Sequence, residues 1–163
     1  MRVIATLGVS ASGKSTWARS HVAAMAGLGQ RWRSLCNDDI RLDLLRARGV
    51  PESELEPALL RWVYSDANPD EALVASILAE RIGQAQLDGL DGIVLANTNL
   101  DGGVGARAAL AAAGAGDLAV ETRRLPISME LALSRDAARA FQVGPQIIAW
   151  QFEKLAALGD ADL

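Results

Sequence analysis

The sequence predicts an α/β fold in which helices cover both faces of a central parallel sheet. Short apolar runs that end at glycine or polar residues alternate with longer amphipathic segments, which is the pattern of successive strand–helix units. Hydrophobic residues make up 50% of the chain and charged residues 22%, so a packed core is expected and intrinsic disorder is excluded. The 163 residues match the usual size of one domain. We therefore expect a single domain over residues 1–163, built on a sheet of four to five strands.

Four strands are predicted from short apolar runs bounded by turn residues. The first run ends at Gly8, and the second ends at the polar stretch that begins at Asn37. The third follows two Asp-Gly turns and leads into a polar loop that holds three glycines, and the fourth follows the turn at residues 114–117. In chain order the predicted strands are residues 2–7, 32–36, 93–96 and 118–123.

Helices are predicted between these strands and after the last one. The first has apolar side chains at spacings of three and four from Trp17 to Met25, which form one stripe. Residues 37–39, Asn-Asp-Asp, can cap the second helix, and residues 49–51 end it. Gly144-Pro145 separates the last two helices. In chain order the predicted helices are residues 15–26, 40–47, 52–64, 69–86, a short one ending at 110–113, then 129–141 and 146–158.

Charge and cysteine content exclude several classes of protein. Sixteen basic residues against twenty acidic residues give a net charge of −4, so a broad basic face for coating nucleic acid is not expected. Binding to one end or one nucleotide needs only a few arginines and stays open. The single cysteine, Cys36, permits neither an internal disulfide nor a cysteine-based zinc site. No targeting or membrane segment is recognised, so we expect a cytoplasmic protein; a homo-oligomer stays open.

The first strand leads directly into a glycine-rich phosphate-binding motif. Residues 8–15 satisfy the pattern G-x-x-x-x-G-K-S/T, between a predicted strand and a predicted helix as the motif requires. The two glycines permit backbone torsions that let successive N–H groups wrap a phosphate, and the helix N-terminus adds partial positive charge. Lys14 then reaches the β- and γ-phosphates, and the Ser15 hydroxyl is a ligand for Mg²⁺. The motif predicts binding of ATP with Mg²⁺ through Gly8, Ser10, Ala11, Ser12, Gly13, Lys14, Ser15 and Thr16.

The second strand delivers two carboxylates and an arginine to the carboxyl edge of the sheet, where α/β folds bind ligands. A carboxylate at Asp38 can orient an acceptor hydroxyl and take its proton while the bond to phosphorus forms. Arg41, one helical turn further on, is placed to hold a phosphate of the acceptor. The alternative is that Asp38 caps the helix and Arg41 is solvated.

Four stretches in order along the chain resemble the 5′-kinase domain of phage polynucleotide kinase and its small P-loop kinase relatives. They are the phosphate loop continued by Thr16-Trp17-Ala18-Arg19, the segment Asp38-Asp39-Ile40-Arg41, the segment Thr98-Asn99-Leu100, and the pair Arg135 and Arg139. The resemblance covers nearly the whole chain, and the second and third stretches are more specific than the phosphate loop. It implies a P-loop kinase fold with a helical lid near the C-terminus.

The resemblance also implies roles for these residues. Asp38 would be the general base and, with Ser15, a metal ligand, and Arg41 would bind the phosphate next to an acceptor 5′-hydroxyl. Asp39, Thr98 and Asn99 would contact the substrate. Arg135 and Arg139, four apart and so on one face of the helix predicted at 129–141, would close over ATP and stabilise charge on the γ-phosphoryl group.

The sequence departs from the family at two places, one that concerns the binding of Mg²⁺ and one that concerns the identity of the acceptor. Asn97 stands where the family has an acidic residue, so a carboxylate for a magnesium-bound water is missing. Residues 101–105, Asp-Gly-Gly-Val-Gly, form a longer loop than the family's helix-starting segment. This loop is placed to contact the acceptor, which leaves the acceptor's identity open.

The leading expectation is an ATP-dependent kinase that phosphorylates a hydroxyl of nucleic acid, most simply the 5′-hydroxyl of DNA or RNA. One alternative keeps the catalytic residues and takes a hydroxymethylated base in phage DNA, such as 5-hydroxymethyluracil, which would have to be flipped out of the duplex. Another alternative is a metabolite kinase of the shikimate or gluconate type, which has similar length and the same loop. A nucleotide-binding regulatory module that hydrolyses ATP slowly is the non-enzymatic alternative.

Overall fold

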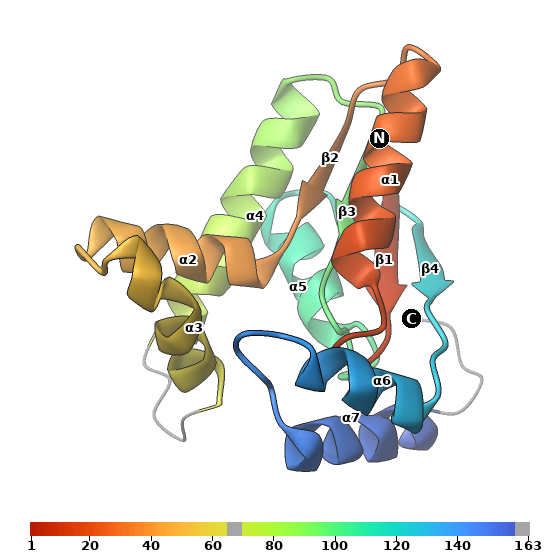
Figure 1. The fold of residues 1–163 in the computed structure, drawn as a ribbon. Helices are drawn as coiled ribbons and strands as arrows, with labels where there is room; N and C mark the ends of the chain where they lie inside the picture. The colour runs from red at the N-terminus through yellow and green to blue at the C-terminus, as the bar shows by residue number, and fades with distance from the viewer. Residues whose placement is uncertain (65–69, 159–163) are drawn as a thin grey trace.

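The computed structural model describes residues 1–64 and 70–158 and contains one parallel sheet of four strands in the order β2-β3-β1-β4. The observed sheet confirms the predicted α/β fold, and the four strands lie within two residues of their predicted limits (Figure 1). The central pair, β1 and β3, are in register from Arg2 opposite Gly92 to Ala5 opposite Leu95. The strands are β1 Arg2–Leu7, β2 Trp32–Leu35, β3 Gly92–Leu95 and β4 Val120–Arg124.

Helices cover both faces of the sheet and its carboxyl edge. Helix α1 lies on one face, α4 and α5 lie on the other, and α6 and α7 pack below the carboxyl ends of the strands (Figure 1). Helices α2 and α3 extend to one side of the sheet. The helices are α1 Lys14–Gly27, α2 Asn37–Ala47, α3 Leu55–Val63 after a short 3-10 turn Glu52–Glu54, α4 Glu71–Leu87, α5 Val104–Ala112, α6 Met129–Ala137 and α7 Pro145–Ala157.

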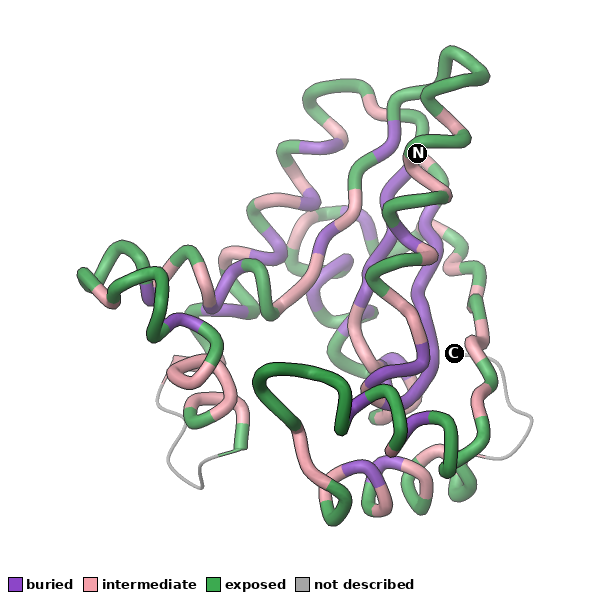
Figure 2. The backbone as a smooth tube through the Cα atoms, viewed as in Figure 1, coloured by how far each residue is buried: buried purple, intermediate pink, exposed green. Residues whose placement is uncertain are grey.

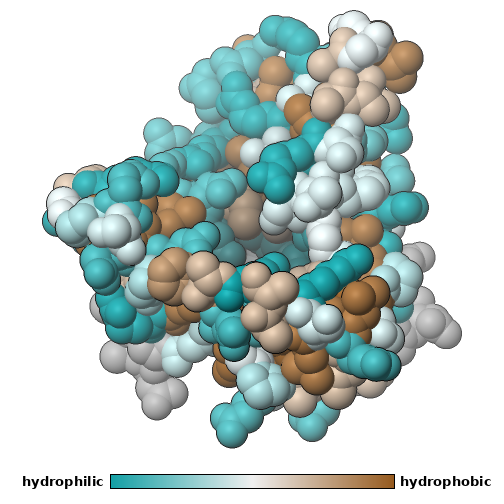
Figure 3. Space-filling view, in the orientation of Figure 1, coloured by the Kyte–Doolittle hydropathy of each residue, from teal (hydrophilic) through white to brown (hydrophobic). Residues whose placement is uncertain are grey.

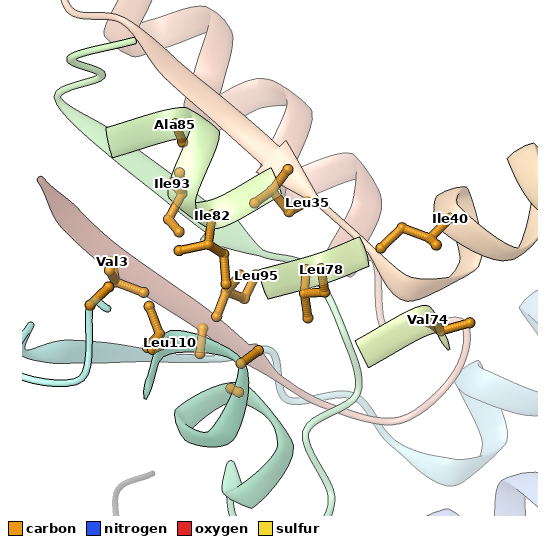
Figure 4. Close-up of a cluster of buried hydrophobic side chains, with 14 residues drawn as sticks. Val3, Leu35, Ile40, Val74, Leu78, Ile82, Ala85, Ile93, Leu95 and Leu110 are labelled. Carbon is orange, nitrogen blue, oxygen red and sulfur yellow. The ribbon is translucent and has the colours of Figure 1, made fainter. Parts of the chain in front are cut away.

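The strand alternation divides the core between the two faces. Successive side chains of a strand point to opposite faces, so Ile4 and Val94 pack toward α1 while Val3 and Ile93 pack toward α4 and α5. The burial map shows this as a buried centre along β1 and β3 (Figure 2), and Figure 4 shows Val3, Ile93 and Leu95 facing Ile82 of α4. The core therefore fixes the strand ends, from which the loops of the carboxyl edge emerge.

Three predicted helix boundaries are wrong by three or four residues. The helix predicted from residue 52 begins with the 3-10 turn Glu52–Glu54 and is α-helical only from Leu55. The second helix begins at Asn37 rather than after residues 37–39, because the extended backbone of Cys36 serves as its N-cap and no side chain forms a capping hydrogen bond. The helix predicted to reach residue 141 ends at Ala137. Buried Asp136 accepts hydrogen bonds from the backbone N–H groups of Val143 and Gly144, at 3.1 and 2.9 Å, and these bonds bring the start of α7 back beside the end of α6.

The long fourth helix begins at Glu71, whereas residue 69, its predicted start, lies outside the described residues. Within the described part of the chain, no helix has the length and apolarity needed to cross a membrane.

Candidate functional site

The loop between β1 and α1 has the strand–loop–helix context that the phosphate motif requires. Ala11 and Gly13 both adopt the left-handed conformation, with φ of 61° and 96°. A side chain at Gly8 would lie 2.8 Å from the Ser12 hydroxyl and 3.1 Å from the Leu125 carbonyl oxygen, so only glycine fits there. The loop is thereby drawn tightly around the N-terminus of α1, where backbone N–H groups can bind phosphate.

Lys14 begins α1 and reaches back over the loop. Its ammonium group donates hydrogen bonds to the carbonyl oxygens of Gly8 at 3.0 Å and Val9 at 2.6 Å. Burial lowers the pKa of Lys14 to about 8, although the nearby Cys36 and Asp38 groups act in the opposite direction. The influence of Asp38 on this pKa places the proposed base within electrostatic reach of the phosphate loop.

The described residues of the loop fit a phosphate ligand. The Ser12 hydroxyl is buried and has no hydrogen-bond partner within the part of the chain that the structure describes. An orphaned donor of this kind is costly unless a ligand satisfies it. The Ser10 N–H is already engaged, because it donates to Oε1 of Gln151 on α7 at 2.6 Å.

Ser15 and Thr16 follow Lys14 in the first turn of α1 and are exposed. Ser15 and Asp38 line the same cleft and are the residues that would hold Mg²⁺. No group of three or more His, Cys, Asp or Glu side chains among the described residues could hold a metal. Mg²⁺ is commonly held by one or two protein ligands together with substrate phosphates, so this pair fits that mode of binding.

The second loop forms an ion-pair triad that the sequence did not predict. Asp38, in the first turn of α2, accepts a 2.7 Å hydrogen bond from Nη1 of Arg41. The Nε and Nη2 atoms of Arg41 donate to the Glu71 carboxylate at 2.8–3.0 Å. The alternative of a solvated arginine beside a capping aspartate is wrong. Arg41 is only 8% exposed, and the N-cap of α2 is Cys36, with no side-chain capping hydrogen bond. Glu71 lies thirty residues from Arg41, and no sequence motif links them.

Asp39 does not line the cleft. Burial and the neighbouring charges of Asp38 and Asp43 raise the pKa of Asp39, while Arg81 and Arg19 act against that rise. The structure therefore separates the two adjacent carboxylates: Asp38 faces the cleft, and Asp39 has cationic neighbours on α1 and α4.

The segment after β3 joins the ends of three elements. Asn99 is buried, adopts φ of 51°, and donates from Nδ2 to the Thr6 carbonyl oxygen at 2.6 Å. The Thr98 carbonyl oxygen accepts the Gly8 N–H at 3.3 Å, and Oδ1 of Asn97 accepts the Asn37 N–H at 2.9 Å. All three residues line the cleft. Their contacts show that they fix the phosphate loop and the start of α2, and contact with a substrate stays a proposal.

The two lid arginines do not share one helix face, contrary to the prediction, because α6 ends between them. Arg135 lies on α6 and donates to the Ala11 carbonyl oxygen at 3.3 Å. Arg139 follows the helix, lies 3.8 Å from an Asp136 oxygen and lines the cleft. Its positive charge is one of the influences that lower the pKa of Lys14. Both arginines therefore lie beside the phosphate loop, one from α6 and the other from the segment that follows it.

One cleft of about 1210 Å³ is lined by much of this set: Ser10, Ala11, Lys14, Ser15, Asp38, Arg41, residues 97–99 and Arg139. The space-filling view shows the surface hollowed between the α2–α3 side and the α6–α7 pair (Figure 3). Tyr64, at the end of α3, lines this cleft together with Ser10 and Gln151. Burial is the main reason that the pKa of Tyr64 is raised. Tyr64, Gln151 and Glu71 are the residues of the site that sequence motifs did not identify.

Cys36 lies between the two loops and lines the cleft. Burial raises the pKa of its thiol to about 11, and the negative charge of Asp38 contributes to the rise. A thiol with this pKa is protonated at neutral pH, which is unfavourable for a nucleophile.

Comparisons with known proteins give a family and a fold. Residues 3–157 match the family described as AAA domain. The structure is similar to a gluconokinase from Sinorhizobium meliloti 1021, with a TM-score of 0.56 and 16% identity, over 98% of this chain and 77% of that one. At that identity the likeness shows a shared P-loop kinase fold. No curated protein matches the sequence significantly. Neither finding singles out the phage polynucleotide kinase domain that the motifs resemble.

Proposed function

The chain belongs to the AAA domain family, and from this premise we propose that it is an ATP-dependent kinase that phosphorylates a hydroxyl group of a small polyhydroxylated compound. The observation that carries the proposal is that a single cleft contains both the phosphate loop with Lys14 and the carboxylate of Asp38. The likeness to a protein named as a gluconokinase supports a small acceptor. The net charge of −4 is also unfavourable for binding along a polyanion.

In the proposed reaction, loop N–H groups and Lys14 hold the β- and γ-phosphates of ATP. Asp38 accepts the proton of the acceptor hydroxyl as its oxygen bonds to the γ-phosphorus, and the bond between that phosphorus and the β–γ bridging oxygen breaks to release ADP. Arg139 and Arg135 stabilise the charge that develops on the transferred group. Mg²⁺, held by Ser15 and Asp38, would neutralise phosphate charge.

An acceptor screen with γ-labelled ATP tests the proposal. The panel contains neutral, cationic and anionic sugars and polyols, a 5′-hydroxyl oligonucleotide, and a 5′-blocked oligonucleotide that carries 5-hydroxymethyluracil. We expect label in a small polyol and in neither oligonucleotide. Label found only in an oligonucleotide would reject the small acceptor while keeping the kinase assignment.

Asp38→Asn provides the residue-level test. We expect the turnover number to fall by about 10²- to 10⁴-fold, because the amide cannot accept the proton, while calorimetry without Mg²⁺ shows ATP affinity close to that of the wild type. Asp43→Asn is the matched control, since Asp43 lies on the same helix but forms exposed ion pairs with Arg46 and Arg81. A nucleotide-binding regulatory module would be indifferent to Asp38→Asn, and full activity of this variant would disprove the proposed base.

The second candidate is a kinase acting on the 5′-hydroxyl of nucleic acid. It is favoured by the combination of Asp38-Asp39-Ile40-Arg41 with Thr98-Asn99-Leu100, which both lie at the carboxyl edge of the sheet. In this function Arg41 would bind the phosphate adjacent to the acceptor. It would then have to exchange one of its two carboxylate partners for that phosphate.

A further inference from the structure

Arg41 uses its three guanidinium nitrogens on two carboxylates. Nε and Nη2 form a two-pronged contact with Glu71, with distances of 2.8, 2.9 and 3.0 Å, and Nη1 contacts Asp38 at 2.7 Å. The Arg41 side chain is 9% exposed, whereas the Glu71 and Asp38 side chains are 44% and 55% exposed. Two-pronged contacts of this kind fix the plane of a guanidinium group. Glu71 therefore determines which way Arg41 presents its remaining nitrogen, and that nitrogen holds Asp38.

The start of α4 is well placed for this role. Glu71 is the first residue of α4, and the preceding Asp70 forms its own ion pair with Arg48 at the end of α2, at 3.0 Å. The two ion pairs tie the N-terminus of α4 to the middle of α2 and to its C-terminal end. Glu71 is thus held against Arg41 from a separate element, α4.

The charge of Arg41 is already neutralised within the site. The cleft is lined by charged side chains of both signs: the cations Lys14, Arg41, Arg139 and Lys154, and the carboxylates Asp38, Glu56, Glu71 and Asp101. Two of these carboxylates, Asp38 and Glu71, form ion pairs with Arg41. A phosphate- or carboxylate-bearing acceptor that binds to Arg41 would have to displace one of them.

We propose that Glu71 is a positioning and specificity-determining residue: it holds Arg41 so that Arg41 orients Asp38, and it neutralises Arg41 so that the site selects uncharged or cationic hydroxyl compounds over anionic ones. The proposal rests on the proposed kinase function and names its substrate class. In this proposal the preferred charge of the acceptor is determined by Glu71, a residue that lies outside all four motifs.

The first experiment measures binding and does not require turnover. With the nucleotide site saturated by a non-hydrolysable ATP analogue, glucose 6-phosphate is titrated into wild-type protein, Glu71→Gln and Glu80→Gln. Glu80 is an exposed residue of α4 that does not line this cleft, so it is a matched control. We expect Glu71→Gln to bind the anion about tenfold more tightly than the wild type, since one charge-assisted contact becomes available. Equal binding, or no binding by any of the three proteins, overturns the specificity role.

The second experiment measures transfer to glucose, glucosamine and any neutral acceptor found in the screen. We expect Glu71→Gln to lower the turnover number by about tenfold or more while the KM for ATP is unchanged, because misorientation of the base affects only the chemical step. Glu71→Asp, which keeps the carboxylate, should recover part of the loss. Equal loss in both variants together with a lower melting temperature would show a structural role only. If the wild type transfers phosphate to no acceptor, the kinase proposal fails, and the anion titration still decides the role of Glu71.

Discussion

Lys14 is a buried ammonium group whose charge is needed for binding phosphate. Burial lowers its pKa to about 8, so in the free protein the cationic form is lost as the pH rises through that value. Apparent affinity scales with the fraction of protein in the binding-competent form. We therefore expect ATP affinity to be nearly constant below pH 7.5 and to weaken by about tenfold for each pH unit above 8. Calorimetric titration of ATP from pH 6.5 to 9.5 measures this dependence.

Lys14→Arg is the control for the pH profile. Its guanidinium group stays charged throughout this range, so its ATP affinity, even if weaker at neutral pH, should not change with pH. Titrations in buffers of different ionisation enthalpy should also show uptake of protons by the wild type near pH 8, as ATP stabilises the charged lysine. A wild-type affinity that stays constant up to pH 9.5 would show that Lys14 is not the group that titrates.

At the scale of the elements, the connection between α6 and α7 depends on one buried carboxylate. Asp136 is 3% exposed and accepts the N–H groups of Val143 and Gly144, while Arg139 lies beside it. Asp136→Ala leaves both N–H groups without this acceptor, and we expect a loss of about 1–3 kcal/mol in the free energy of unfolding. Chemical denaturation measures the loss. Ser134→Ala, an exposed change on the same helix, should lie within about 0.5 kcal/mol of the wild type.

The same elements show what the sequence can and cannot predict. Apolar periodicity and the phosphate motif depend on neighbouring residues, and they located the four strands and the strand–loop–helix unit. The end of α6 depends on hydrogen bonds from Asp136 to residues seven and eight positions later, so local pattern could not reveal it. Arg41 and Glu71 are thirty residues apart in the sequence and lie on different helices, so their contact depends on how α4 packs beside α2. Motifs therefore pointed to Asp38 and Arg41 but missed Glu71, which pairs with Arg41.

At the scale of the whole molecule, net charge and its distribution decide what kind of acceptor can approach. The protein has a net charge of −4, and within its cleft Arg41 is already paired with the carboxylates of Asp38 and Glu71. A long polyanion gains nothing from such a surface, because binding along nucleic acid requires an extended row of basic side chains. A neutral acceptor is indifferent to the screening of these charges by salt.

Salt dependence therefore distinguishes the candidate acceptors. At saturating ATP, with the acceptor identified by the screen, we expect the logarithm of kcat/KM for the acceptor to change little between 50 and 500 mM KCl. Binding of one nucleic-acid end through one to three phosphates would give a log–log slope of about −1 to −3, because each neutralised phosphate releases about one counterion. A slope steeper than about −5 would require tracking along an extended backbone. Either of these slopes would contradict a neutral acceptor.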